Sequence, residues 1–159
     1  MTLRLKYKNL SAEGMRAMWG VHSYVSGSGL EASLTELIYL RVSQINGCAH
    51  CIDMHSTELQ NLGLSSEKLM LLSVWREAEA LFSERERAAL AWSELVTLIA
   101  DNEISDSDFN AVRSVFSEKE TADLTIAIGL INAYNRLAIS FKSPPETVLN
   151  LEKQAQKTS

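Results

Sequence analysis

Cysteine and proline are both scarce in this chain of 159 residues. The two cysteines lie only three positions apart, whereas a secreted disulfide scaffold is dense in cysteine. The two prolines are adjacent, at Pro144 and Pro145, so the first 143 residues contain no proline that would interrupt a helix. These shortages favour an intracellular protein that is largely helical and carries a special cysteine pair.

Long apolar runs and dense basic segments are also missing. The longest strongly apolar stretch without a charge, Leu124 to Asn135, is well short of the roughly 18–20 residues that cross a bilayer. No apolar run of the signal-peptide type follows Met1 to Lys6. The formal net charge is −5, and no basic run could neutralise a row of phosphates. We therefore expect a cytoplasmic protein that neither spans a membrane nor binds nucleic acid.

The remaining composition is that of a globular protein. Hydrophobic residues make up 46% of the chain and charged residues 22%, both close to globular averages. A chain of this length removes about two thirds of its unfolded surface from water when it folds, so its core can be stable without disulfide or metal cross-links. We expect a single domain over residues 1–159.

Apolar residues recur at helical spacing, and no alternating strand pattern of useful length occurs. Spacing and helix-ending glycines bound three predicted helices: Ser11–Ser26, Leu34–Ile45 and Cys48 to Asn61. Three more begin at capping boxes, in which a serine precedes an acidic residue by three positions: Ser83, Ser105 and Ser117. We therefore predict an all-α fold, in which the helices on either side of Gly47 form a hairpin.

Three segments carry further expectations. Ala122 to Ala138 has almost no polar face, which predicts a helix enclosed on all sides, with another subunit among its surroundings. The polar tail after Asn150 is expected to be a frayed end. An apolar stripe in the first helix is expected to be core, together with a histidine beside it: Met15, Met18, Trp19 and His22.

The residues best suited to catalysis lie directly after Gly47, where a helix begins. The free N–H groups and the positive dipole end of a helix favour a thiolate over a thiol. Cys51 and His55 are i and i+4 on this helix, and Cys48 and Cys51 are i and i+3, so both sulfurs and the imidazole lie in one line. Proximity to His55 favours Cys51 as the nucleophile, whereas the position at the helix start favours Cys48.

The predicted hairpin adds a carboxylate to this group. Antiparallel pairing around Gly47 places Glu36 about one turn from His55. A carboxylate beside an imidazole can orient it and stabilise the imidazolium, which would complete a relay from Glu36 through His55 to Cys51. Ser33 to Glu36 is also a capping box, so Glu36 could instead close a helix start.

Two other interpretations of the cysteines remain open. A structural zinc site needs four ligands, and the local Cys48, Cys51 and His55 would need His22 or His50 as the fourth. The cysteines could also be buried and inert, although burial alone does not call for a histidine at i+4.

These residues together resemble a known family. Glu36 is followed by Leu-Ile-x-Leu-Arg-Val-Ser-Gln-x-Asn-Gly-Cys-x-x-Cys-x-x-x-His, which is similar to the core motif of AhpD-like alkylhydroperoxidases within the carboxymuconolactone decarboxylase family. The resemblance covers Leu34 to about Leu98, and Asn132–Ala138 is similar to the family's later helix. It implies a helical-bundle subunit that assembles into trimers or hexamers, with a thiol peroxidase site at the hairpin and with neither cofactor nor bound metal.

The resemblance also implies roles for single residues. Glu36, Cys48, His50, Cys51 and His55 fall on the family's relay positions, with Cys51 as the peroxide-attacking sulfur and Cys48 as the resolving one. The predicted function is a thiol-dependent peroxidase that reduces hydroperoxides at the expense of an external dithiol. Two alternatives are a lactone decarboxylase or isomerase acting on a small carboxylic acid, and a redox-sensing or disulfide-carrying protein that turns over no peroxide.

The cysteine spacing generates the first testable prediction. Mild oxidation of the reduced protein should lower its mass by two hydrogens, and dithiothreitol should restore it, because the pair at a helix start forms a reversible disulfide. Intact-protein mass spectrometry measures both steps, with Cys48→Ser as the control that cannot close the bond. Two thiols that stay free under these conditions would contradict the redox interpretation.

Overall fold

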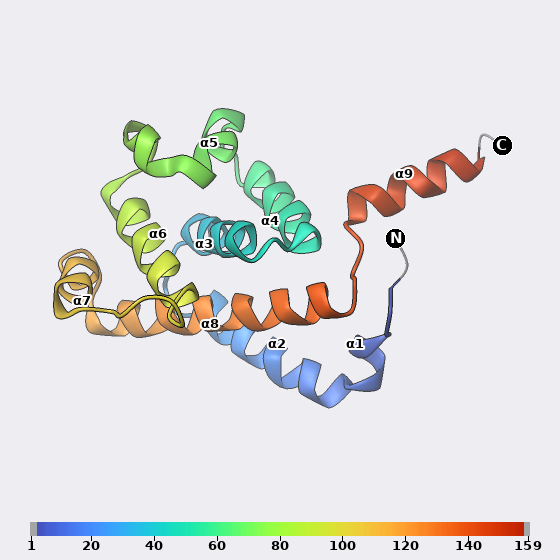
Figure 1. Ribbon diagram of the computed structural model, residues 1–159, viewed down its shortest axis with the longest axis horizontal. Helices are drawn as coiled ribbons and strands as arrows, with labels where there is room; N and C mark the ends of the chain where they lie inside the picture. The colour runs from blue at the N-terminus through green and yellow to red at the C-terminus, as the bar shows by residue number, and fades with distance from the viewer. Residues whose placement is uncertain (1–2, 158–159) are drawn as a thin grey trace.

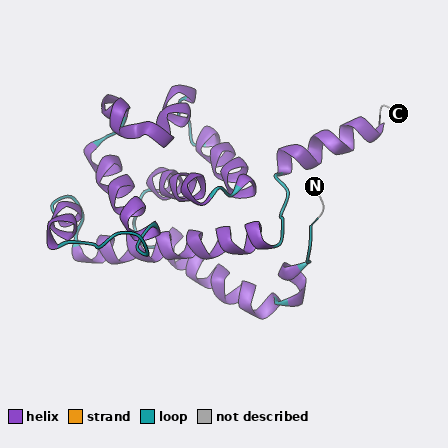
Figure 2. Cartoon of the chain, in the orientation of Figure 1, coloured by secondary structure: helices purple, strands orange, loops and turns teal. Residues whose placement is uncertain are grey.

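The structure is a computed structural model that describes residues 3–157. Within this range the secondary structure is helical and contains no strand, so the all-α prediction is confirmed (Figure 2). In chain order the elements are α1 (Tyr7–Leu10), α2 (Ala12–Ser26), α3 (Ala32–Asn46), α4 (Ala49–Asn61), α5 (Ser66–Leu71), the 3-10 helix η1 (Leu72–Leu81), α6 (Glu84–Thr97), α7 (Asp106–Arg113), α8 (Glu118–Ser140) and α9 (Glu146–Lys157).

Helix α3 occupies the centre of the fold. It is seen end-on in Figure 1, with α4, α6 and α8 around it, and it packs against all three. One side of α3 joins a core cluster with α6 and α8, which includes Ile38, Val42, Ala89, Ile128 and Ile131. The other side joins a second cluster with α4, η1 and α6, which includes Leu37, Leu40, Leu59, Trp75 and Leu90. A central helix of this kind holds its polar side chains in positions fixed by packing on every side.

Local signals set the ends of several helices as predicted. The capping boxes at Ser83, Ser105 and Ser117 each have both of their reciprocal hydrogen bonds. Gly47 and Gly63 end α3 and α4 in the left-handed conformation, with φ of 70° and 86°. Glycine carries little penalty there because it has no Cβ.

The segment between Gly63 and Ser83 holds helices that the periodicity did not predict. Ser65 caps α5 by accepting a hydrogen bond from the Lys68 N–H. The following η1 has non-helical backbone angles at Val74 and Ala78. These kinks interrupt the 3.6-residue period, so no apolar stripe runs far enough to identify a helix.

The tail after Asn150, which was expected to be frayed, is helical as far as Lys157. Helix α9 extends from beyond the end of α8 and points away from the other helices (Figure 1). Its first turn is fixed to α4, because the N–H and the hydroxyl of Thr147 both donate hydrogen bonds to the carboxylate of Asp53, at 3.0 and 2.5 Å. This contact spans 94 residues and gives no local signal in the sequence.

The expectation that the stripe on α2 is core is also wrong. Trp19 is 62% exposed, and Met15 and Met18 are only half-buried. The buried residue of α2 is Val25. Within this chain α2 packs along α8 and against α1, so the rest of its apolar surface stays uncovered.

Helix α8 is likewise not enclosed on all sides by its own chain. Its inner face is buried, but Ile126 is 41% exposed, and Gly129 and Ala133 are exposed beside it. An apolar strip on α8 therefore faces outward. Among the described residues, no helix combines the length and the apolar character needed to cross a membrane.

A buried carboxylate ties α3 and η1 to α6. Glu94 accepts hydrogen bonds from Arg41 Nε at 2.7 Å and Trp75 Nε1 at 3.0 Å, and it also pairs with Arg76. Burial by itself would raise the pKa of Glu94, but the hydrogen bonds from Arg76, Trp75 and Arg41 outweigh it and hold the pKa below its usual value. The ionised carboxylate therefore stabilises the folded state.

Replacing Glu94 tests this contribution. Glu94→Gln should lower the free energy of unfolding by about 2–4 kcal/mol at pH 7, because it leaves Arg41 largely buried without a countercharge. Since the folded-state pKa is depressed, the stabilisation is complete above the ordinary pKa of 4.5 and disappears as pH falls through the folded-state value. Urea unfolding across this pH range should show a shallower acid dependence for the variant.

The matched control is Glu77→Gln, an exposed glutamate on η1, which should leave stability unchanged. Parallel pH profiles for wild type and Glu94→Gln would contradict the assignment.

Candidate functional site

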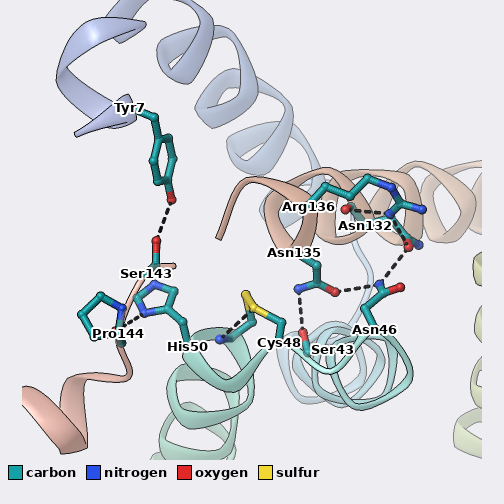
Figure 3. The surroundings of a disulfide bond; sticks show 11 residues. Tyr7, Ser43, Asn46, Cys48, His50, Asn132, Asn135, Arg136, Ser143 and Pro144 are labelled. Atoms are coloured by element: carbon teal, nitrogen blue, oxygen red, sulfur yellow. Dashed lines mark hydrogen bonds between the residues drawn. A yellow bond between two sulfur atoms is a disulfide. The ribbon is translucent and has the colours of Figure 1, made fainter. Parts of the chain in front are cut away.

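The two cysteines lie at the start of α4 and are joined as a disulfide. Cys48 is the N-cap residue, and its sulfur accepts a hydrogen bond from the Cys51 N–H at 3.3 Å (Figure 3). Both side chains are buried. The predicted pairing is confirmed. A helix-start N–H directed at the Cys48 sulfur favours negative charge there when the bond is opened.

Cys51, and not Cys48, lines a cavity of ≈ 570 Å³. Most of the cavity wall is aromatic or aliphatic, and it includes Tyr7, Met15, Tyr39, Met54, Ile131 and Tyr134. Of the two cysteines, Cys51 is therefore the one that a molecule in the cavity contacts. The two cysteines thus differ in their contact with the cavity, although both are almost fully buried.

Glu36 and His55 form a hydrogen-bonded pair at the cavity wall. His55 Nδ1 lies 2.7 Å from Glu36 Oε2. The side chain of His55 is 7% exposed and that of Glu36 is 18% exposed. A carboxylate accepts hydrogen bonds, so Nδ1 carries the proton and the neutral imidazole has its lone pair on Nε2. The predicted proximity of Glu36 and His55 is confirmed.

The alternative capping role of Glu36 is wrong. Helix α3 begins at Ala32 with Glu31 as its N-cap residue, so Ser33 lies inside the first turn instead of capping it. The side chain of Glu36 is directed to His55 on the neighbouring helix.

His50 lines the same cavity and is held from its other side. Its Nδ1 lies 2.9 Å from the carbonyl oxygen of Pro144 (Figure 3). A carbonyl only accepts, so His50 Nδ1 is the donor and Nε2 carries the lone pair. The proline pair thus has a position in the site, because it supplies the carbonyl that orients His50.

His22 is not the core histidine that was expected. It is half-buried, lines the cavity and stacks on Trp19, with ring centroids 4.7 Å apart and an interplanar angle of 11°. Within residues 3–157, no group of three histidine, cysteine or acidic side chains is placed to hold a metal ion.

A network of asparagines supports the turn that leads to Cys48. Asn46 Nδ2 donates to Oδ1 of Asn132 at 3.0 Å and to Oδ1 of Asn135 at 2.9 Å (Figure 3). Asn135 is fully buried, and its Nδ2 donates to Ser43 Oγ at 3.0 Å. The last turn of α3 is therefore fastened to α8 immediately before the cysteine pair.

Tyr39 belongs to the site, and the sequence analysis missed it. It lies one turn after Glu36 on α3, is 3% exposed, and its ring centroid is 5.2 Å from that of His55. Burial first, and then the negative charge of Glu36, raise the pKa of its hydroxyl. The i, i+3 spacing from Glu36 was the available signal, but Tyr39 also fits the apolar period of a core helix.

Comparison with known proteins agrees with the fold and with the motif. Residues 12–95 match the model of the carboxymuconolactone decarboxylase family. The chain is 36% identical over 140 residues to the uncharacterized protein YdfG of Bacillus subtilis strain 168, which covers 88% of this chain and 95% of YdfG.

Two solved structures extend the comparison. A protein of unknown function from Agrobacterium tumefaciens, provisionally assigned as the antioxidant defence protein AhpD, is 43% identical with a TM-score of 0.86, covering 91% of this chain and 98% of that one. A variant of the debrominase Bmp8, solved in complex with 2,3,4-tribromopyrrole, is 17% identical with a TM-score of 0.72, covering 86% and 72%. At that identity the likeness to Bmp8 shows the fold alone.

The family match includes more than half of the chain and the whole cysteine hairpin. The AhpD-like relative from Agrobacterium tumefaciens shares the fold over nearly its full length. The chain is therefore an AhpD-like member of the carboxymuconolactone decarboxylase family.

Proposed function

We propose that this protein is a thiol-dependent peroxidase that reduces organic hydroperoxides at Cys51 through a Cys48–Cys51 disulfide cycle. The observation that supports it most is the convergence of Cys51 and the His55–Glu36 pair on one largely apolar cavity. Folds of this kind host more than one chemistry, so the proposal depends on these side chains and not on the fold.

The first step oxidises Cys51. His55 Nε2 takes the proton of the Cys51 thiol, and the Glu36 carboxylate stabilises the imidazolium that forms. The thiolate attacks the terminal oxygen of the hydroperoxide, the O–O bond breaks, and Cys51 becomes a sulfenic acid. The leaving alkoxide recovers the proton from His55 and departs as an alcohol.

The second step closes the disulfide. The Cys48 thiolate, favoured by its position as N-cap of α4, attacks the sulfenic sulfur, and the S–O bond breaks. The departing hydroxide takes up the proton that the Cys48 thiol gave up and leaves as water. An external dithiol then reduces the disulfide by thiol–disulfide exchange and supplies the two electrons of the cycle. The cycle needs no cofactor, and a reducing cytoplasm would provide the dithiol.

The cavity lining supports an organic substrate over hydrogen peroxide. Aromatic and aliphatic side chains such as Met54 and Ile131 gain from contact with an alkyl or aryl group. His50, whose Nε2 is free to accept a hydrogen bond, would hold the substrate or a water molecule at the same wall.

The uncovered apolar faces of α2 and α8 support a homo-oligomer, and we propose the trimer or hexamer that the family resemblance implies. Val21 and Tyr24 on α2 are 39% and 50% exposed, and Ile126 on α8 is 41% exposed. Apolar surface of this extent promotes association, and closed symmetry would hide it.

The native mass tests the oligomer. Sedimentation of the untagged protein at micromolar concentration should give a multiple of 17.7 kDa, and Ile126→Glu should reduce it because a charge is placed in the buried contact. Met70→Glu, at a more exposed apolar residue on α5, is the control and should leave the mass unchanged. A wild-type particle near 17.7 kDa would contradict the proposal.

Trapping the sulfenic acid tests which cysteine attacks. After one equivalent of cumene hydroperoxide, dimedone should label Cys48→Ser and should not label Cys51→Ser, because Cys51 is the one of the two cysteines that lines the cavity. Mass spectrometry of the two variants measures the labelling. Labelling confined to Cys51→Ser would reverse the two roles.

Removing the relay tests the base. His55→Ala and Glu36→Gln should each slow peroxide consumption by about 10²-fold, the range typical for a positioned proton-transfer group. Glu58→Gln is the matched control, because Glu58 lines the same cavity but is not hydrogen-bonded to His55. A Glu36→Gln enzyme with the wild-type rate would show that the carboxylate has no part in the reaction.

A further inference from the structure

Two buried polar atoms, on side chains that line the cavity, have no hydrogen-bond partner among the described residues. They are Oη of Tyr39 and Nε2 of His55. Both side chains line the cavity together with Cys51, and their rings lie 5.2 Å apart. Burying a polar group without a partner costs free energy, so such a pair beside a reactive sulfur indicates atoms that a substrate satisfies.

Packing alone does not account for the hydroxyl of Tyr39. Its ring sits in the core cluster around α3, where a phenylalanine would fill the same space without a buried polar atom. The hydroxyls of two other tyrosines have protein partners, since Tyr24 donates to Asp123 at 2.8 Å and Tyr7 lies 3.4 Å from Ser143 Oγ. Tyr39 therefore differs from Tyr7 and Tyr24 in having a buried hydroxyl without a protein partner.

The protonation states make the two atoms a matched pair during the reaction. Because Glu36 holds the proton on Nδ1 of His55, Nε2 is the atom that receives the Cys51 proton and then becomes a donor. Burial and the charge of Glu36 raise the pKa of Tyr39, so its hydroxyl stays protonated and is also a donor. Two donors then belong to side chains that line one cavity, which suits an oxygen that becomes negatively charged.

We propose that Tyr39 is a catalytic residue whose hydroxyl binds the leaving oxygen of an organic hydroperoxide. The inference rests on the proposed peroxidase function and deepens it.

The Cys51 thiolate forms a bond to the terminal oxygen, and the pair of electrons from the O–O bond stays on the oxygen that carries the organic group. Tyr39 stabilises this alkoxide by a hydrogen bond, and His55 gives it the proton that came from the thiol. The sulfur loses two electrons and keeps the hydroxyl as a sulfenic acid, while the peroxide gains two electrons and leaves as an alcohol.

Tyr39→Phe isolates the hydroxyl, and Tyr7→Phe is the matched control because Tyr7 lines the same cavity. Reduced proteins are mixed in single turnovers with cumene hydroperoxide, with peracetic acid and, separately, with iodoacetamide. Tyr39→Phe should slow the reaction with cumene hydroperoxide by about 10- to 10³-fold, the range for loss of one oxyanion donor. The reaction with peracetic acid should slow much less, because its carboxylate leaving group needs little stabilisation.

The remaining readouts separate a catalytic role from a structural one. Alkylation of Tyr39→Phe by iodoacetamide should keep its wild-type rate, since no alkoxide leaves, and the melting temperature should be unchanged or higher. Tyr7→Phe should leave the ratio of the rates with the two peroxides unchanged, because it removes a hydroxyl from the same cavity and not the one assigned to the leaving oxygen. A lower melting temperature, equal slowing with all three reagents, or an unchanged rate with cumene hydroperoxide would each overturn the inference.

The wild-type protein tests the proposed peroxidase function, and the Tyr39→Phe variant tests the role of Tyr39. A wild-type protein that reacts with neither peroxide would remove the proposed function and the role of Tyr39 with it. A reactive wild type with an equally reactive Tyr39→Phe variant would remove only the role of Tyr39.

Discussion

The hydrogen bond between His55 and Glu36 is the contact on which the proposed chemistry of this site depends. It joins α4 to α3 across the hairpin at 2.7 Å and fixes which imidazole nitrogen carries the proton. Its geometry is stable because α3 is packed on every side and because Glu94 ties α3 to α6 through Arg41. For the proposed peroxidase reaction, the imidazole is therefore already oriented before a substrate arrives, which lowers the cost of reaching the transition state.

The two cysteines have different surroundings although they are three residues apart. Cys51 lines the apolar cavity, whereas Cys48 caps α4, next to the turn that Asn46 and Asn135 fasten to α8. A nucleophile must meet the substrate, and a resolving thiol needs only to meet the sulfur beside it. One helix start would meet both conditions of the proposed cycle.

Local signals made much of the fold predictable. Capping boxes at Ser83 and Ser117 and glycines at positions 47 and 63 act within a few residues, so they are legible in the sequence. The hairpin placed Glu36 beside His55 by simple pairing around a turn. The contacts that were missed act over long distances in the chain, such as Thr147 with Asp53 and His50 with Pro144. Tyr39 was missed for another reason. A tyrosine that contributes its hydroxyl to a site has the same helical spacing as a residue that only fills the core.

Steady-state consumption of cumene hydroperoxide with dithiothreitol as the external dithiol tests the central claim most directly. The wild-type protein and the Cys48→Ser, Cys51→Ser double variant are measured side by side at matched concentration. The disulfide cycle predicts turnover beyond one equivalent in the wild type and a rate no greater than that of free dithiol in the double variant. Equal rates in the two proteins would contradict the assignment of this site to peroxide reduction.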